Sequence, residues 1–280
     1  PTGGAVTNAI LETVDAVLEN AELDASDVVG VGVGSIGPLD AEGGMVVSPS
    51  NLSPDVEGIA LRGPLEDHLD APVSVENDAI AALIGERSRV TNPPDDMAYL
   101  TLSTGIGAGV AVDGKVLRGW GGNAAEVGHF VVDPEGEITC GCGREGHWEA
   151  YAGGANIPEY ARSLADEFEG GTDLPLDSAD FDAADVFSMA GEDVFADIVV
   201  HRLERWNAIG LANLVHAYAP EVVSIGGTVA LENPELVVDP LRDRLPPLVT
   251  TRVPEIRLTP AGEDAVLQGA IELARRASRA

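Results

Sequence analysis

Both cysteines of the 280-residue chain lie in one short stretch, CGCGREGHWE, whose residue types suit a metal ion. Cys140 and Cys142 are separated by one glycine, and His147 follows on the same stretch. A second histidine, His129, precedes them in the segment EVGHF. Thiolate and imidazole are ligands that Zn²⁺ prefers, four of them in a tetrahedron. The set His129, Cys140, Cys142 and His147 therefore predicts a closed, structural zinc site rather than a hydrolytic one.

Two other interpretations of the cysteine pair remain. A disulfide between Cys140 and Cys142 would close a very tight ring that fits disulfide geometry poorly, and it would need an oxidising compartment. Two inert buried thiols would need an apolar core, which the flanking glycines supply poorly. A bound zinc contributes on the order of 10 kcal/mol to local order, enough to hold a glycine-rich loop.

Strands alternate with helices along the chain, which is typical of an α/β protein. Apolar spacing predicts helices at 5–20, 61–69, 78–86, 156–168, 192–218 and 264–276, and strands at 28–34, 71–76, 97–103 and 221–225. Segment 107–119 resembles a hairpin with a type I′ turn at Asp113-Gly114, and the acidic segment 169–185 predicts a surface loop. Glycine turns follow two strands, at STGIGAG (103–109) and GGT (226–228), where backbone N–H groups can approach phosphate oxygens.

The charge of the chain is strongly negative, with 47 acidic residues against 16 basic ones and a net charge of −31. Such a chain repels itself in dilute salt, whereas near 1 M salt the Debye length falls to about 3 Å. We therefore expect a cytoplasmic protein of a salt-accumulating halophile. The same charge excludes nucleic acid as a partner. No apolar run reaches about 18 residues and no charged-then-apolar leader is visible, so we expect neither membrane insertion nor secretion.

The motifs of the chain resemble those of the ROK family of sugar kinases and repressors. EVGH and CGCGREGHWE are similar to the family's E-x-G-H and C-x-C-G-x-x-G-C-x-E, and VENDAIAALIGE to its E-N-D-A-N-x-A-A-x-G-E. VGVGSIGPLD, SPSNL, LTLSTGIGAGVAVDGKVLRG and PEVVSIGGTV resemble its first sugar-domain turn, P-N-L segment, phosphate-loop hairpin and P-x-x-I-x-x-G-G. His147 replaces the third cysteine of the pattern, and Ile80 replaces its second asparagine. The D-x-G-x-T strand with which the family's kinases begin is not in the sequence, and we expect a front segment to be missing.

The resemblance implies an actin-like, ribonuclease-H-like α/β fold with two domains flanking a cleft. We expect a smaller domain at 1–96, completed by the C-terminal helix 264–280, and a larger one at 97–263 with the zinc loop and the nucleotide-side glycine turn. The implied activity is ATP-dependent phosphorylation of a sugar 6-hydroxyl, with glucose as the expected substrate. N-acetylmannosamine, N-acetylglucosamine and fructose are rival substrates. A sugar-sensing transcriptional repressor is a rival function, as is a chain that binds sugar and zinc without turnover.

The resemblance also assigns roles to single residues. Asp78 stands where a strand gives way to a helix, where a lone aspartate is usually a helix cap. The matching motif makes it the general base for the attacking hydroxyl, and the helix N-terminus is expected to keep it ionised. The implied sugar-binding residues are Asn77, Glu126, His129 and Glu149, with Gly37 and Asn51 as further candidates.

The implied nucleotide-binding residues belong to the two glycine turns: Thr104, Gly105, Gly107, Gly226 and Gly227. Trp120 and Trp148 are expected to pack in the wall of the sugar pocket rather than to act in catalysis. The expected cofactors are ATP, Mg²⁺ and the structural Zn²⁺, and we expect a homo-oligomer, either a dimer or a tetramer.

Overall fold

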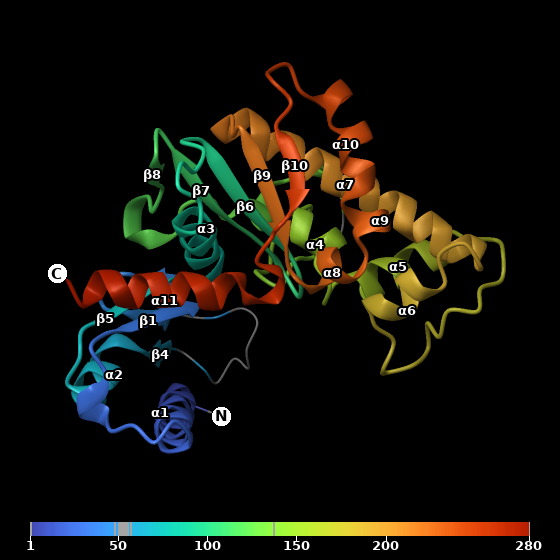
Figure 1. Cartoon of the computed structure of the whole chain (residues 1–280). Helices are drawn as coiled ribbons and strands as arrows, with labels where there is room; N and C mark the ends of the chain where they lie inside the picture. Colours follow the sequence, from blue (N-terminus) through green and yellow to red (C-terminus); the bar gives the residue numbers. More distant parts are fainter. Residues whose placement is uncertain (1, 48, 50–55, 57, 137, 280) are drawn as a thin grey trace. The chain divides into compact units, whose positions relative to one another are not determined.

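The computed structural model of the chain describes residues 2–47, 49, 56, 58–136 and 138–279 (Figure 1). It divides into two compact units. Unit 1 consists of residues 1–93, 116–124 and 264–280, and unit 2 of residues 94–115 and 125–263. Asn51 and most of the SPSNL segment lie outside the described residues. None of the described helices is long and apolar enough to cross a bilayer.

Unit 1 is built on a pair of parallel strands, β1 (Val31–Ser35) and β5 (Val73–Asn77). A small antiparallel sheet follows β1 in the chain and consists of β2 (Leu39–Asp40), β3 (Met45–Val47) and β4 (Gly58–Ala60). The helices of the unit are α1 (Gly3–Asn20), α2 (Arg62–Leu69), α3 (Asp78–Ser88) and α11 (Ala265–Ala277). The register pairs Ser35 with Asn77, so the carboxyl ends of β1 and β5 lie level.

Helix α11, from the end of the chain, packs on α3 and β1 at very short range. The short range depends on glycines, because a Cβ on Gly269 would overlap the carbonyl of Ala81, and a Cβ on Gly32 would overlap the carbonyl of Ala270. Close packing of this kind leaves no room for larger residues. The C-terminal helix therefore fixes the position of β1 and of α3, at whose first turn Asp78 stands.

Unit 2 contains a five-stranded sheet in the order β10-β9-β6-β7-β8. Its strands are β6 (Met97–Leu102), β7 (Ile106–Val112), β8 (Lys115–Val116), β9 (Val222–Gly226) and β10 (Glu255–Leu258). β6, β9 and β10 are parallel, while β7 is antiparallel to β6. As a result, the turn after β6 and the turn after β9 leave the sheet at the same edge.

Most of the helices of unit 2 pack against α7, a long and largely buried helix. The helices of the unit are α4 (Trp148–Ala152), α5 (Ile157–Ala165), α6 (Ala183–Ser188), α7 (Val194–Tyr218), α8 (Thr228–Glu232), α9 (Pro234–Val237) and α10 (Asp239–Arg244). Trp148 of α4 is fully buried and lies directly over Gly210 of α7, where a Cβ would overlap the indole. Its Nε1–H donates to Asn207 Oδ1 at 2.9 Å. The cysteine loop is therefore followed by a helix held rigidly in the core.

Most of the elements predicted from apolar spacing are confirmed, including the hairpin, whose Asp113 and Gly114 both have the positive φ of a type I′ turn. The strand predicted at 28–34 is shorter at its start, since β1 begins at Val31. The loop predicted at 169–185 ends earlier, because Asp182 caps α6. Short elements that the apolar pattern did not predict are β2, β3, β4, β10, α4, α6 and α8 to α10, which are too short to show a period.

Candidate functional site

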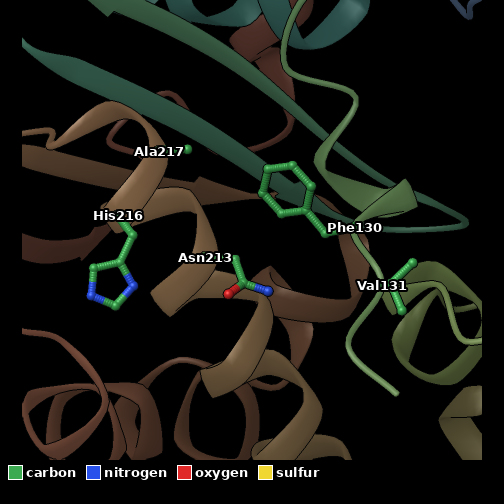
Figure 2. A pocket seen from close by; sticks show the side chains of 5 residues that line it. All are labelled: Phe130, Val131, Asn213, His216 and Ala217. Carbon is green, nitrogen blue, oxygen red and sulfur yellow. The ribbon is translucent and has the colours of Figure 1, made fainter. Parts of the chain in front are cut away.

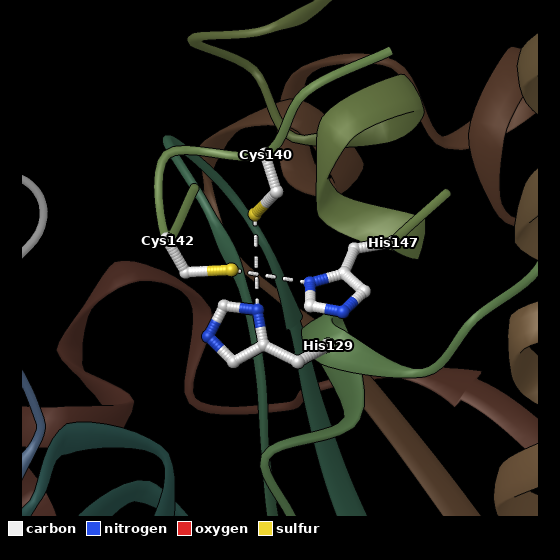
Figure 3. Close-up of side chains that lie close together, drawn as sticks. All are labelled: His129, Cys140, Cys142 and His147. Carbon is white, nitrogen blue, oxygen red and sulfur yellow. Dashed lines mark hydrogen bonds between the residues drawn. The ribbon is translucent and has the colours of Figure 1, made fainter. Parts of the chain in front are cut away.

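The four residues predicted to bind a metal converge in unit 2 (Figure 3). One ligand atom from each of His129, Cys140, Cys142 and His147 lies within 4.8 Å of the other three. The Cys142 sulfur is 3.2 Å from Nδ1 of His147, and the Cys140 sulfur is 3.8 Å from Nδ1 of His129. With Zn–S near 2.3 Å and Zn–N near 2.05 Å, a tetrahedral ion would set a sulfur and a nitrogen about 3.6 Å apart. The donor set therefore fits Zn²⁺ in both chemistry and spacing.

The protonation of these side chains is shaped by their burial. Burial raises the pKa of the Cys140 thiol to about 12, with the negative charge of Glu149 among the further causes. Burial also lowers the pKa of His147, and the neighbouring His129 adds to this effect. A neutral imidazole is the form that ligates a metal. His129 points Nδ1 at a thiol, so its Nε2 faces away from the cluster.

The backbone around the cluster folds into a tight loop of its own. Cys140 N–H donates to the carbonyl of Arg144, and Gly143 N–H donates back to the carbonyl of Cys140, each at 2.8 Å. Gly146 has φ +73°, and a Cβ there would overlap the carbonyl of Asp133. Gly146 is thus required by a backbone contact, whereas Gly143 is favoured by its φ of +79° and has open space around it. No disulfide joins the cysteines, which are both free.

Glu149, predicted to bind sugar, connects the cysteine loop to the first glycine turn. Its Oε2 accepts the N–H of Ile106 at 2.8 Å, and its Oε1 lies 3.7 Å from the Cys140 sulfur. An added Cβ on Gly105 would lie only 2.5 Å from Oε2, so a side chain at 105 would displace the carboxylate. One oxygen of Glu149 is therefore already used to hold the turn.

The turn after β6 is clamped at several points. Gly154 N–H donates to the carbonyl of Ser103 at 2.7 Å, and Ala155 N–H donates to the carbonyl of Thr104 at 3.0 Å. The second glycine turn lies against it, since Thr228 N–H reaches the Ser103 hydroxyl at 3.4 Å. Gly227 has φ +89°, and a Cβ there would lie 2.5 Å from the carbonyl of Leu102. The two turns predicted for the nucleotide, with Thr104, Gly105, Gly107, Gly226 and Gly227, are therefore neighbours in unit 2.

Asn77 and Asp78 lie in unit 1, at the carboxyl end of β5. Asn77 Oδ1 accepts the N–H groups of Ala79 at 2.9 Å and Ile80 at 3.4 Å, so Asn77 is the N-cap of α3. Asp78 Oδ1 also accepts the N–H of Ala79, at 2.7 Å. Burial nevertheless raises the pKa of Asp78, because desolvation outweighs the hydrogen bonds from the backbone N–H groups of Ala79 and Asp78. Burial therefore opposes the effect of the helix N-terminus, and the ionised state of Asp78 at neutral pH stays a prediction.

Glu126 is exposed and directly follows a strained residue. Ala125 is buried and has φ +63°, a left-handed conformation that costs an alanine about 1–3 kcal/mol. The backbone of Glu126 then accepts the N–H of His129 at 3.1 Å. Strain of this kind cannot be read from residue type, so the sequence offered no signal for Ala125.

The two tryptophans expected near the sugar differ in burial. Trp120 is fully exposed (101%) and packs against nothing in the described structure, whereas Trp148 is buried against α7. A surface hollow of about 430 Å³ is lined by Phe130, Val131, Asn213, His216 and Ala217 (Figure 2). Phe130 directly follows His129 in the sequence. This lining contains no carboxylate, which a site for sugar hydroxyls would need, and His216 Nε2 accepts the N–H of Thr250.

Comparison with known proteins gives a consistent result. Residues 2–277 match the ROK family. A glucokinase from Pyrobaculum calidifontis is 40% identical over 97% of this chain and 88% of its own length. An N-acetylmannosamine kinase from Vibrio cholerae is 31% identical over 95% of this chain and 87% of its own length.

The structural comparison points the same way. A ROK family glucokinase from Streptomyces griseus, solved in complex with glucose and AMPPNP, has a TM-score of 0.80 and 32% identity. The match covers 99% of this chain and 89% of that one. The α/β fold of the chain is therefore the actin-like, ribonuclease-H-like fold that the motifs implied.

Proposed function

We propose, for a chain that belongs to the ROK family, that it is an ATP-dependent hexose kinase acting on glucose. The reaction moves the γ-phosphoryl group of MgATP to the sugar 6-hydroxyl. The observation that carries the proposal is the likeness, over nearly the whole chain, to a glucokinase structure that contains glucose and AMPPNP. The motifs of this chain fall at strand ends and glycine turns, which are the positions where such folds bind ligands.

Asp78 is the proposed general base. Its carboxylate takes the proton of the 6-hydroxyl as the hydroxyl oxygen attacks the γ-phosphorus, and the bond from phosphorus to the bridging oxygen of ADP breaks. The raised pKa makes Asp78 a stronger proton acceptor than an ordinary aspartate. Asn77, whose Oδ1 is used by the helix cap, has its amide N–H groups left to donate to a hydroxyl.

Unit 2 supplies the remaining proposed contacts. Glu126, Glu149 and His129 Nε2 are proposed to bind sugar hydroxyls, and the two glycine turns are proposed to bind the phosphates through backbone N–H groups. In phosphoryl transfer most of the rate comes from positioning and charge neutralisation, so rigid turns matter as much as the base. The clamps from Glu149, Gly154 and Ala155 provide this rigidity.

A structural zinc ion is proposed at His129, Cys140, Cys142 and His147. When bound, it would stabilise the cysteine loop and hold His129 with Nε2 directed away from the metal. Metal analysis of the purified protein should give one zinc per chain, and Cys142→Ser should lower this content. A protein with full activity and no zinc would remove this part of the proposal.

The test of the activity is ADP release in molar KCl with glucose, N-acetylmannosamine, N-acetylglucosamine and fructose. Glucose should give the highest kcat/KM, and Asp78→Asn should abolish most of the signal with every sugar. Because one relative is an N-acetylmannosamine kinase, that sugar is the second candidate substrate. ADP release with none of the four sugars would sink the kinase proposal.

We further propose that the protein is cytoplasmic in a halophile and is most active in concentrated salt. Its net charge of −31 is spread along the chain, and salt near 1 M screens charges beyond about 3 Å. Dialysis to low salt should lower the melting temperature, reversibly on adding KCl. A dimer or tetramer is the proposed assembly, which light scattering at the working salt concentration would measure.

A further inference from the structure

The most exposed aromatic side chain of the described residues lies at the tip of an arch in unit 1. Trp120 is fully exposed, whereas Trp148 (0%) and Trp206 (7%) are buried. The arch, residues 118–124, is closed by the N–H of Ala124, which donates to the carbonyl of Arg118 at 3.1 Å. The exposed indole presents a large, rigid apolar surface to solvent.

One end of the arch is fixed to β5, whose carboxyl end carries Asn77 and Asp78, and the other end is fixed to β2. At one end, Arg118 pairs with Glu76 at 2.6 Å and 2.7 Å, and Glu76 lies two residues before Asp78. At the other end, Asn123 accepts the N–H of Leu39 at 2.9 Å and donates to its carbonyl at 2.8 Å. The arch therefore spans from the carboxyl end of β5 to β2, the strand that follows β1.

The backbone of the arch depends on glycine. Gly119, Gly121 and Gly122 have φ of +64°, +77° and +87°, and a Cβ on Gly122 would lie 2.7 Å from the Cβ of Ala41. The Asn123 amide donates to the carbonyl of Gly121 at 3.1 Å. The arch is thus an ordered support with glycines on both sides of the indole, which leave both ring faces uncovered.

We propose that Trp120 is a substrate-binding residue, whose indole stacks on the apolar face of the hexose bound beside Asp78. This rests on the proposed kinase function. Ligands of open α/β sheets bind outside the carboxyl ends of strands, which is where the arch is anchored. The chair form of glucose has equatorial hydroxyls, so axial C–H bonds make its ring faces apolar and suited to an aromatic surface. Tryptophan supplies the largest such surface.

Acrylamide quenching of tryptophan fluorescence reports mainly on Trp120, because it is the only one of the three tryptophans that is exposed. In Asp78→Asn protein, which should bind sugar without turnover, D-glucose should shift the emission to shorter wavelength. It should also lower acrylamide quenching by about half, since a sugar covers one face of the ring. L-Glucose should change neither, and Trp120→Phe should remove the response.

Kinetics give an independent readout in the otherwise unchanged enzyme. Trp120→Ala should raise KM for glucose about 10-fold with kcat within about twofold, the pattern of a lost contact that is equal in ground and transition states. Trp120→Phe should stay within about threefold of the parent, because a ring remains.

The outcomes separate the two proposals. Glucose phosphorylation with the same KM in Trp120→Ala, together with unchanged quenching, overturns the role of Trp120 and leaves the kinase intact. Quenching that falls with protein concentration but not with glucose also overturns it, in favour of contact with a second copy of the chain. Absence of any glucose binding by calorimetry overturns both.

Discussion

Two turns from strand to helix, one in each unit, differ in residue type: the first carries polar side chains and the second carries glycines. Between β5 and α3, Asn77 and Asp78 place side-chain oxygens on the N–H groups of the first helical turn. Between β9 and α8, Gly226 and Gly227 provide no side-chain cap. A proton acceptor must be a side chain, whereas a phosphate can be bound by backbone N–H groups if nothing bulky intervenes. Under the proposed function, the first turn supplies the base and the second turn binds a phosphate.

The strongest way to break this comparison is to remove the charge at the first turn. Asp78→Asn keeps an oxygen for the N–H of Ala79 but cannot accept a proton from the sugar. We expect kcat to fall about 10²- to 10⁴-fold, with glucose affinity changed only severalfold. Steady-state ADP release and calorimetry measure the two quantities. Full activity in the variant would show that Asp78 is only part of the helix start.

The second turn can be broken by adding one methyl group. Gly227→Ala combines φ +89° with a Cβ 2.5 Å from the carbonyl of Leu102, so we expect a loss of about 2–3 kcal/mol and a raised KM for ATP. Gly191→Ala is the matched control, since Gly191 has φ +87° but open space around it. It should cost about 1 kcal/mol and leave KM unchanged. Equal effects of the two changes on KM would refute the role of the second turn.

The cap itself can be separated from the chemistry. Asn77→Ala removes the acceptor for Ala79 and Ile80, so we expect a loss of about 1 kcal/mol in unfolding free energy and a raised KM for glucose. Asp182→Ala removes a similar cap at α6, far from the proposed residues in sequence. Asp182→Ala should lower the unfolding free energy by a similar amount with no change in KM for glucose. Denaturant titration measures the free energy, and steady-state kinetics measure KM. An unchanged KM in Asn77→Ala would restrict Asn77 to capping.

The smallest expected effect concerns pH. Burial raises the pKa of Asp78 above 3.8, and the base must be ionised, so the acid limb of kcat/KM should lie above pH 3.8. Between pH 3.8 and the folded pKa, the folded state binds more protons than the unfolded state, so stability falls as pH rises through this range. At neutral pH the ionised carboxylate therefore costs stability. Asp78→Asn should melt at a higher temperature than the parent at pH 7, and a lower one would contradict the raised pKa.

Some parts of the candidate site could be predicted because residue types alone restrict them. Two cysteines and two histidines in one short region predicted the cluster, and the structure brings their ligand atoms together. The glycines after two strands predicted turns whose backbone N–H groups a phosphate could approach. In the structure, the turns after β6 and β9 are neighbours. Other parts could not be predicted, because they depend on contacts distant in sequence. The bond from Glu149 to Ile106 joins residues 43 positions apart, and Asn123 reaches Leu39 across 84 positions.

By itself, the sequence determined the order of the long strands and helices, the ligand types of the cysteine loop, the strongly negative charge and the family. These follow from residue identity, local period and turn chemistry, which act over a few neighbouring residues. Only the tertiary structure decided that burial raises the pKa of Asp78, that Ala125 is held at positive φ, and that Trp120 is left in water. Burial, strain and exposure arise from the packing of distant segments, which a local pattern does not encode.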